Sequence, residues 1–256
     1  MSNKISVITI VFNDVQHIRE TMESFFSQTW QDKEYIVIDG GSTDGTADVI
    51  REYSDRLAFW CSEPDDGIYD AMNKGINHCT GDWINILNSG DVFADEYVLQ
   101  HSMELSRDME TDVLYGNSRE ISKGESRHIE AYADSGIMDL VPAYRHGSSL
   151  VRAKVHKANK FDLSKREQLG YALDWEQIHR LYKQGFKFCK LDLEIQSFQK
   201  KGISDNTIQS YWYNYKITSE GKFNLRKFIH FVRITTTTLI KNCLRKKTKH
   251  YHGREQ

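Results

Sequence analysis

Trp83-Ile84-Asn85-Ile86-Leu87-Asn88-Ser89-Gly90-Asp91 is an apolar run that stops abruptly in small polar residues and a carboxylate. The pattern predicts a buried strand that places Asp91 at its carboxyl end, where parallel α/β sheets bind ligands because the connecting loops diverge there. A lone carboxylate among small residues suits a hard divalent cation, which takes oxygen ligands. The alternative is an ordinary turn, since Asn, Ser, Gly and Asp dominate turns for conformational reasons.

The segments on either side of this stretch alternate between expected strands and expected helices. Apolar runs predict strands at 5–11, 35–38, 57–61 and 112–115, the first of them buried on both faces. Apolar residues at helical spacing predict a helix from Ile18, capped by Asn13 or Asp14, a helix after residue 46 that carries Tyr53, and helices at 68–79 and 94–109. This order predicts an α/β fold with a mostly parallel central sheet flanked by helices.

After residue 116 the pattern becomes less regular. Residues 119–130, broken at 123–124, predict a hairpin, and 147–151 a strand. A helix opens at Asp174 and closes before Gly185, and the alternation of Leu191, Leu193 and Ile195 predicts a strand buried on one face. We expect one domain over residues 1–205, with halves at 1–116 and 117–205, and a C-terminal helical extension over residues 206–256.

Composition indicates a soluble globular protein. The 256 residues are 39% hydrophobic and 27% charged, and the four cysteines fit neither a metal knuckle nor a redox pair, as expected in a reduced, cytosolic compartment. We expect no secretory signal, and no run of about 18 uncharged apolar residues is present to span a membrane.

The charge is unevenly distributed. The net charge of −2 hides +9 over residues 221–256 and therefore −11 over the preceding part of the chain. In the tail, Lys and Arg alternate with apolar residues such as Leu225, Phe228, Ile229 and Val232, which predicts a basic amphipathic helix or helix pair. No nucleic-acid-binding module is recognisable. The tail is expected either on an anionic membrane surface or packed on the domain with a solvated basic face.

The turn at residues 39–46 is rich in glycine but matches neither the dinucleotide fingerprint nor the Walker loop, so hydride transfer and P-loop phosphoryl transfer are poorly supported. Asp39 ends a predicted strand and can accept hydrogen bonds from a nucleoside, whereas Ser42 or Asp44 can cap the next helix. Segments 9–14, 39–46 and 88–91 should meet at one sheet edge. This convergence predicts a nucleotide-diphosphate site with a metal.

Four stretches occur in the order typical of family 2 glycosyltransferases: ISVITIVFN at 5–13, IDGGSTDGT at 38–46, EPDDGIYDAMNKGI at 63–76 and LNSGD at 87–91. The chain most resembles bacterial members that build colanic acid, capsule and other surface polysaccharides. The resemblance implies a Rossmann-like A-type glycosyltransferase fold, a nucleotide-sugar donor (a UDP-sugar favoured over a GDP-sugar), Mn²⁺ or Mg²⁺, and inversion at the anomeric carbon. It also implies a glycan or polyprenyl-linked acceptor.

The resemblance assigns roles on the donor side. Thr9 and Asp39 match positions that contact the nucleobase, and Asp91 matches the last carboxylate of the family's D-x-D-like motif, which holds the metal. Asn88 and Gly90 stand where many relatives have acids, so only one carboxylate remains. The implied donor-binding residues are Thr9, Asn13, Asp39, Asn73, Lys74, Asn88 and Asp91.

On the acceptor side, residues 171–176 resemble the family's "ED" segment, in which Asp174 matches the base that takes the proton of the acceptor hydroxyl. Alternatively, Asp174 caps a helix, and Glu176 is the fallback base. His146 lies in a segment that is near the acceptor in relatives, although an isolated histidine is more often structural. Residues 201–204 resemble a loop that reaches the diphosphate.

The sequence therefore predicts an inverting, metal-dependent glycosyltransferase of bacterial surface polysaccharide synthesis. It would be cytoplasmic, with its tail at the inner face of the cytoplasmic membrane, a donor half at 1–116 and an acceptor half at 117–205. An inactive scaffold protein of a polysaccharide assembly complex is the rival, as Gly90 suggests, but the retained Asp174 argues against it. A sugar nucleotidyltransferase should carry an N-terminal glycine-rich phosphate loop ending in a basic residue, and this chain has none.

Overall fold

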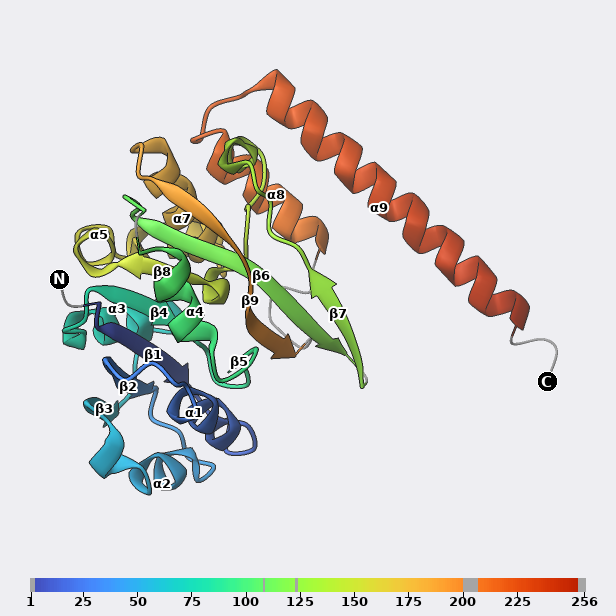
Figure 1. The fold of residues 1–256 in the computed structure, drawn as a ribbon. Coiled ribbons are helices and arrows are strands. Elements are labelled where there is room, and N and C mark those ends of the chain that lie inside the picture. Colours follow the sequence, from blue (N-terminus) through green and yellow to red (C-terminus); the bar gives the residue numbers. More distant parts are fainter. Residues whose placement is uncertain (1–2, 108, 123, 200–206, 253–256) are drawn as a thin grey trace.

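The computed structural model describes residues 3–107, 109–122, 124–199 and 207–252, and shows a sheet with helices packed on both faces (Figure 1). The nine-stranded sheet has the order β3-β2-β1-β4-β8-β6-β9-β5, with β7 paired to β6. Its strands are β1 (Ile5–Val11), β2 (Lys33–Asp39), β3 (Phe59–Ser62), β4 (Trp83–Ile86), β5 (Val92–Phe93), β6 (Val113–Ser122), β7 (Glu125–Ile129), β8 (Ser149–Arg152) and β9 (Phe188–Gln199).

The helices lie between these strands and after them. The α-helices are α1 (Ile18–Phe26), α2 (Thr46–Arg51), α3 (Ile68–His78), α4 (Val98–Leu105), α5 (Ala153–Ala158), α6 (Arg166–Leu169), α7 (Leu173–Lys183), α8 (Thr207–Thr218) and α9 (Leu225–His252). Short 3₁₀ helices are η1 (Ser54–Arg56), η2 (Ser135–Asp139), η3 (His146–Ser148) and η4 (Leu163–Lys165).

The α/β fold with a mostly parallel sheet is confirmed. Strands β3, β2, β1 and β4 run parallel, as do β6 and β9, whereas β8, β5 and β7 pair antiparallel with their neighbours. β1 is buried over its whole length. Because side chains alternate along a strand, Ile8 and Ile10 enter one core cluster and Val7 and Val11 the other.

Two helix predictions are wrong in detail. Neither Asn13 nor Asp14 caps α1, because its N-cap residue is His17 and Asn13 adopts a left-handed backbone with φ of 49°. The helix expected at 94–109 is shorter, since residues 92–93 form β5 and the carboxylate of Asp95 accepts a hydrogen bond from the backbone of Tyr97 at 2.8 Å. Such local bonds compete with helix.

Two apolar residues near the end of that predicted range are exposed. Leu105 is 50% exposed and Met109 is 42% exposed, whereas Leu99 and Met103 face the core. The helix after residue 46 also ends early, at Arg51, and Tyr53 lies beyond it in a buried position. Its N-cap residue is Gly45 with φ of 99°, and the carboxylate of Asp44 accepts a hydrogen bond from the backbone N–H of Thr46, the first residue of the helix, at 3.0 Å.

The predicted tail contains two helices with different surroundings. α8 packs on α7 and places Ile217 in the core, and Tyr213 meets Tyr171 edge to face with 5.4 Å between ring centroids. α9 lies along α8 and then continues past it (Figure 1). None of the described helices combines the length and apolar content needed to cross a membrane.

Candidate active site

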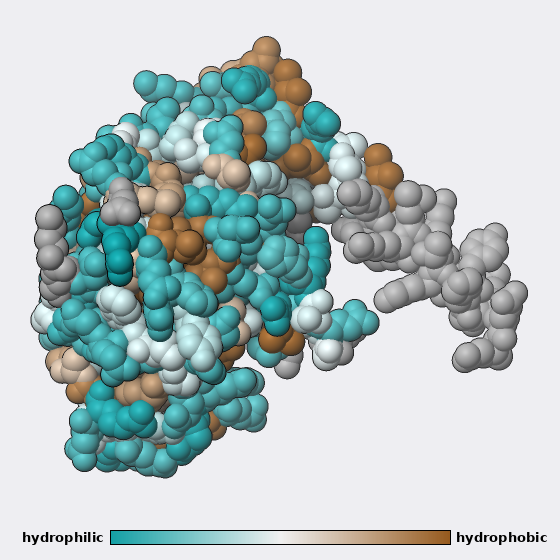
Figure 2. Space-filling view, viewed as in Figure 1, coloured by the Kyte–Doolittle hydropathy of each residue, from teal (hydrophilic) through white to brown (hydrophobic). Residues whose placement is uncertain are grey.

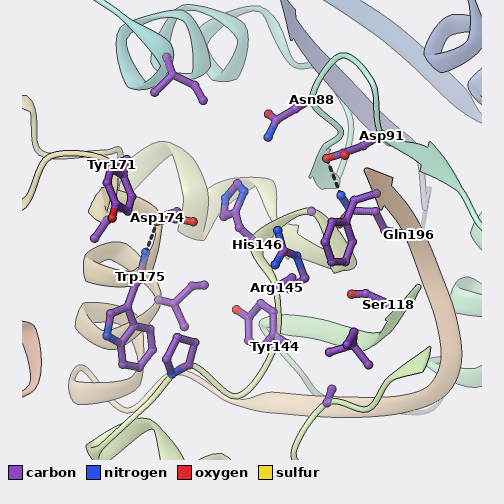
Figure 3. A pocket seen from close by; sticks show the side chains of 18 of the residues that line it. Asn88, Asp91, Ser118, Tyr144, Arg145, His146, Tyr171, Asp174, Trp175 and Gln196 are labelled. Carbon is purple, nitrogen blue, oxygen red and sulfur yellow. Dashed lines mark hydrogen bonds between the residues drawn. The ribbon is translucent and has the colours of Figure 1, made fainter. Parts of the chain in front are cut away.

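A cavity of about 880 Å³ lies at the carboxyl end of β4 and is lined by residues from both halves of the chain and from α8. Asp91 and Asp174 line opposite sides of it, with Arg145 and His146 between them (Figure 3). A cavity of this size accommodates a ligand of several hundred daltons. Asp91 and Asp174 can therefore both contact molecules that are bound together in it.

The three predicted loop segments meet at this edge of the sheet. The backbone N–H of Ser89 donates to the carbonyl of Ile10 at 3.1 Å, and that of Asp14 donates to the hydroxyl of Thr46 at 3.0 Å. The backbone N–H of Thr43 donates to Oδ1 of Asn13 at 2.9 Å. Asn13 thus connects the loop after β1 to the turn at 39–46.

Asp91 sits on a tight turn after β4. Gly90 has φ of 86°, and the backbone N–H of Asp91 donates to the carbonyl of Asn88 at 3.0 Å. From β9, Nε2 of Gln196 donates to Oδ2 of Asp91 at 2.6 Å (Figure 3). Burial raises the pKa of Asp91 to about 7, against the opposing effects of the Arg145 guanidinium and the Gln196 hydrogen bond.

The loop at 88–91 fits a divalent cation that takes most of its ligands from elsewhere. Besides the carboxylate of Asp91, the side-chain oxygen of Asn88 is buried and has no hydrogen-bond partner among the described residues. No group of three or more His, Cys, Asp or Glu side chains in the described part of the chain could hold a metal. Mg²⁺ and Mn²⁺ accept such partial sites when diphosphate and water complete the shell.

Asp14 and His17 form a polar pair beside this loop that sequence reasoning missed. Oδ1 of Asp14 lies 2.5 Å from Nδ1 of His17, while Oδ2 accepts a hydrogen bond from the hydroxyl of Ser89 at 2.7 Å. Both side chains line the cavity. The spacing of three residues, which brings side chains together on one helical turn, was the available signal.

Asp174 lies in the first turn of α7, where a carboxylate is favoured by the helix dipole. Its Oδ1 accepts from the backbone N–H of Trp175 at 2.8 Å, and the hydroxyl of Tyr69 lies 3.2 Å away. The N-cap residue of α7 is Ala172, so Asp174 does not occupy the cap. Its side chain faces the cavity (Figure 3).

Glu176, the fallback base, does not line the cavity. Its side chain is 8% exposed and pairs with Lys165 at 2.6 Å and Arg180 at 3.3 Å. These two ion pairs hold the carboxylate of Glu176 outside the cavity lining, away from a bound acceptor.

His146 begins η3 and lines the cavity near Asp174. Burial lowers the pKa of His146, against the opposing charge of Asp174. The ring is therefore mostly neutral near pH 7 and can exchange hydrogen bonds without adding charge. It also packs edge to face on Phe161, with 5.6 Å between ring centroids.

Thr9 and Asp39 are fully buried at the ends of β1 and β2 and are not among the described residues that line the cavity. The hydroxyl of Thr9 lies 2.7 Å from the hydroxyl of Tyr35 and donates to the carbonyl of Leu87 at 2.7 Å. The carboxylate of Asp39 accepts hydrogen bonds from Ser42 and Ser62. Their contact with a nucleobase stays a prediction.

Asn73 and Lys74 on α3 also lie outside the cavity lining. The amide of Asn73 donates to the carbonyl of Phe161 at 2.9 Å and accepts from its N–H at 3.0 Å. Lys74 pairs with Glu63 at 3.2 Å and with Asp70 at 3.5 Å. Both side chains thus anchor neighbouring segments, and their donor contacts stay predictions. Residues 201–204, predicted to reach the diphosphate, lie outside the described residues.

Several cavity residues escaped sequence reasoning. Gln196 follows the alternation of β9 and points to the face opposite Ile195, which was a usable signal. Arg145 and the α8 residue Asn214 gave no signal, because chain segments far apart in sequence bring them to the cavity.

Comparison with known proteins shows the family and the fold of this chain. Residues 6–164 match the family model described as glycosyl transferase family 2. The chain is similar to an uncharacterized glycosyltransferase of Mycobacterium tuberculosis, with 43% identity over 101 residues, 39% of this chain and 38% of that relative. It is also similar to glycosyltransferase GlyA of Streptococcus pneumoniae, with 23% identity over 67% of this chain and 27% of that relative. The chain thus spans well under half the length of these two relatives.

Solved structures share the fold. The crystal structure of S. aureus TarS 1-349 in complex with UDP-GlcNAc has a TM-score of 0.66 at 17% identity, covering 85% of this chain and 71% of that TarS 1-349 chain. The mannosyltransferase PcManGT from Pyrobaculum calidifontis, in complex with GDP-Man and Mn²⁺, has a TM-score of 0.65 at 14% identity, covering 91% of this chain and 69% of that protein. With the family model matching more than half of its length, the chain belongs to the family 2 glycosyltransferases.

Proposed function

We propose that this glycosyltransferase moves a sugar, with inversion, from a nucleotide-sugar donor to a glycan or polyprenyl-linked acceptor in bacterial surface polysaccharide synthesis. The observation that carries the proposal is the placement of Asp91 and Asp174 on opposite sides of one cavity. The fold neighbours bound to UDP-GlcNAc and to GDP-Man with Mn²⁺ support a nucleotide-sugar donor and a divalent cation.

On the donor side, Asp91 and Asn88 would hold Mn²⁺ or Mg²⁺. When bound, the cation stabilises the negative charge that develops on the departing diphosphate. Asp39 fixes the turn at 39–46 through Ser42, and Asn13 connects this turn to the loop after β1. The nucleoside, with uridine favoured over guanosine, would lie against this turn.

On the acceptor side, Asp174 would take the proton of the acceptor hydroxyl as that oxygen attacks the anomeric carbon. The bond between the anomeric carbon and the diphosphate breaks on the opposite face, so the configuration inverts. The neutral ring of His146 lies beside this base and can donate or accept a hydrogen bond that orients the acceptor hydroxyl.

The C-terminal helices support a location at the inner face of the cytoplasmic membrane. Figure 2 shows apolar side chains on the surface at the top of the view, where α8 and α9 lie in Figure 1. Leu225 is 62% exposed, Ile229 57% and Val232 44%, and Lys and Arg follow one another along the same helix. Apolar residues flanked by basic ones bind anionic lipid surfaces. In the alternative arrangement, the tail packs on the domain and its basic face contacts solvent instead of lipid.

Liposome co-sedimentation separates these two arrangements. The full-length chain should sediment with vesicles containing anionic lipid and stay in solution with neutral vesicles, and Ile229→Asp with Val232→Asp should abolish the difference. Equal sedimentation of the double variant and the parent would remove the membrane proposal.

A thermal-shift screen of UDP- and GDP-sugars, with and without Mn²⁺, tests the proposed function. Binding to the folded state raises the apparent melting temperature, so one donor should raise it and Mn²⁺ should enlarge the shift. Absence of a shift with every donor would contradict the proposal. Donor binding without release of the nucleotide, over a panel of acceptors, would favour the scaffold alternative.

A further inference from the structure

We propose that the guanidinium of Arg145 binds the diphosphate of the donor, on the side of that group away from the cation held by Asp91. The inference rests on the proposed function and adds to it a second positive group, supplied by the chain itself. Arg145 directly precedes His146, in the segment that the resemblance places near the acceptor, but the resemblance assigns no role to Arg145 itself.

The position of Arg145 is fixed by its backbone and by an aromatic ring. The residue precedes η3 in an extended conformation, with φ of −84° and ψ of 140°, and its side chain lines the cavity. Its Cζ lies 3.7 Å from the ring centroid of Phe198 on β9. A guanidinium over a ring is attracted by the ring face and keeps its N–H groups at its edge for other partners.

The donors of this guanidinium are available to a ligand. Arg145 is exposed, and no hydrogen bond or ion pair of its guanidinium is found with any residue that the structure describes. In Figure 3 it lies between His146 and Gln196, and therefore between the two carboxylates of the cavity. A cation in this position attracts whatever anionic group enters.

Charge pairing favours the diphosphate as that group. Arg145 is close enough to stabilise the charged form of Asp91, yet it forms no direct ion pair with this carboxylate. An anionic group that enters the cavity between them would meet the proposed metal ion on its Asp91 side and the guanidinium of Arg145 on the other. Arginine matches phosphate oxygens with two parallel hydrogen bonds, which a lysine cannot reproduce.

Two other roles are open to Arg145, and each has its own signature. It could support Asp91 alone, in which case its loss would affect metal binding in the absence of nucleotide. It could bind an acidic group of the acceptor, in which case its loss would raise the KM for acceptor and leave donor affinity unchanged.

The test is calorimetric titration of UDP, GDP, uridine and guanosine into the full-length protein with Mn²⁺, for the parent, Arg145→Gln and Arg145→Lys. Arg56→Gln is the matched control, because Cζ of Arg56 lies 3.6 Å from the ring centroid of Phe26, on an exposed residue outside the cavity lining. Titration of Mn²⁺ alone and acceptor kinetics complete the set.

We expect Arg145→Gln to weaken diphosphate binding on the order of 10- to 100-fold, as for loss of charge-assisted hydrogen bonds, and nucleoside binding less than about twofold. Arg145→Lys should fall between the parent and Arg145→Gln, and Arg56→Gln should match the parent. Unchanged diphosphate affinity, equal weakening of nucleoside and diphosphate, or an effect on Mn²⁺ alone would each overturn the inference while the proposed function stands. If neither UDP nor GDP binds the parent, the proposed function fails first.

Discussion

Nε2 of Gln196 donates a 2.6 Å hydrogen bond to Oδ2 of Asp91, across a sequence separation of 105 residues. The bond joins β9 to the loop after β4 and so connects a strand late in the chain to the proposed metal ligand. Gln196 is 2% exposed and packs against Gly147, where a Cβ atom would collide with its amide. The orientation of Asp91 therefore depends on a glycine that never touches it.

Gly147→Ala should disturb the cation site without adding or removing a charge. The new methyl group displaces Gln196, and Asp91 loses a hydrogen bond worth about 1 kcal/mol. We expect Mn²⁺-dependent UDP or GDP affinity to fall about 3- to 10-fold, measured by calorimetry. Gln196→Ala should reproduce the loss, and combining the two changes should add little. Full affinity in both variants would show that Gln196 does not position Asp91.

The stability of the metal-free protein should depend on the ionisation of Asp91. Burial raises the pKa of this carboxyl to about 7, well above the value near 3.9 of an unfolded chain. The folded state therefore binds the proton of Asp91 more tightly than the unfolded chain does. The free energy of unfolding that this proton contributes is fully present below a pH of about 4 and is lost as the pH rises through about 7.

Asp91→Asn removes this titration and keeps an oxygen acceptor for Gln196. In urea unfolding with EDTA, the variant should be more stable than the parent at pH 8, by roughly 1–3 kcal/mol, and equal to it at pH 4. A variant less stable than the parent at pH 8 would mean that Asp91 stabilises the fold as a charged group.

Asp174→Asn should abolish transfer and leave donor binding intact. Removal of a general base costs a factor of about 10² to 10⁴ in rate, whereas the amide keeps the size of the side chain. The measurement is kcat for nucleotide release with acceptor present, beside a donor titration. Asp162→Asn is the control, because Asp162 caps η4 and is not among the cavity-lining residues. Near-normal transfer by Asp174→Asn would place the base elsewhere.

Asn73→Ala should lower stability more than donor affinity. Both polar atoms of its amide bond the backbone of Phe161, so truncation leaves two partly buried backbone groups unpaired, at a cost of roughly 1–3 kcal/mol. Asn77→Ala, on an exposed position of α3 that bonds Lys160, should cost less than about 0.5 kcal/mol. A large loss of donor affinity with normal stability would instead support the contact implied by the family resemblance.

The sequence predicted the parts of the fold that local pattern determines. β1, β2 and β4 were recognisable because strands buried on both faces are continuous apolar runs. The helix at 94–109 was extended too far, because Asp95 forms a local turn that periodicity does not reveal. The predicted cap of α1 was wrong for a similar reason. The carboxylate of Asp14 bonds the side chains of His17 and Ser89 instead of a backbone N–H of the helix.

The candidate site was predicted where single residues follow strand ends, as for Asn88 and Asp91. It was not predicted where the fold brings distant segments together, as for Arg145 and Gln196. Thr9 and Asn73 were predicted to contact the donor, whereas the structure shows their side chains bonded to the carbonyls of Leu87 and Phe161. A hydrogen bond between strands that are far apart in the sequence leaves no pattern in the residues around either partner.

The proposed roles of Asp91 as metal ligand and of Asp174 as general base are tested most directly by calorimetric titration of the donor nucleotide into the metal-loaded protein. UDP and GDP are titrated with Mn²⁺ and with EDTA into the parent, Asp91→Asn and Asp174→Asn. We expect Asp91→Asn to lose at least about tenfold of the Mn²⁺-dependent affinity and Asp174→Asn to remain within about twofold of the parent. Unchanged Mn²⁺-dependent affinity in Asp91→Asn would contradict the assignment of the cation to Asp91.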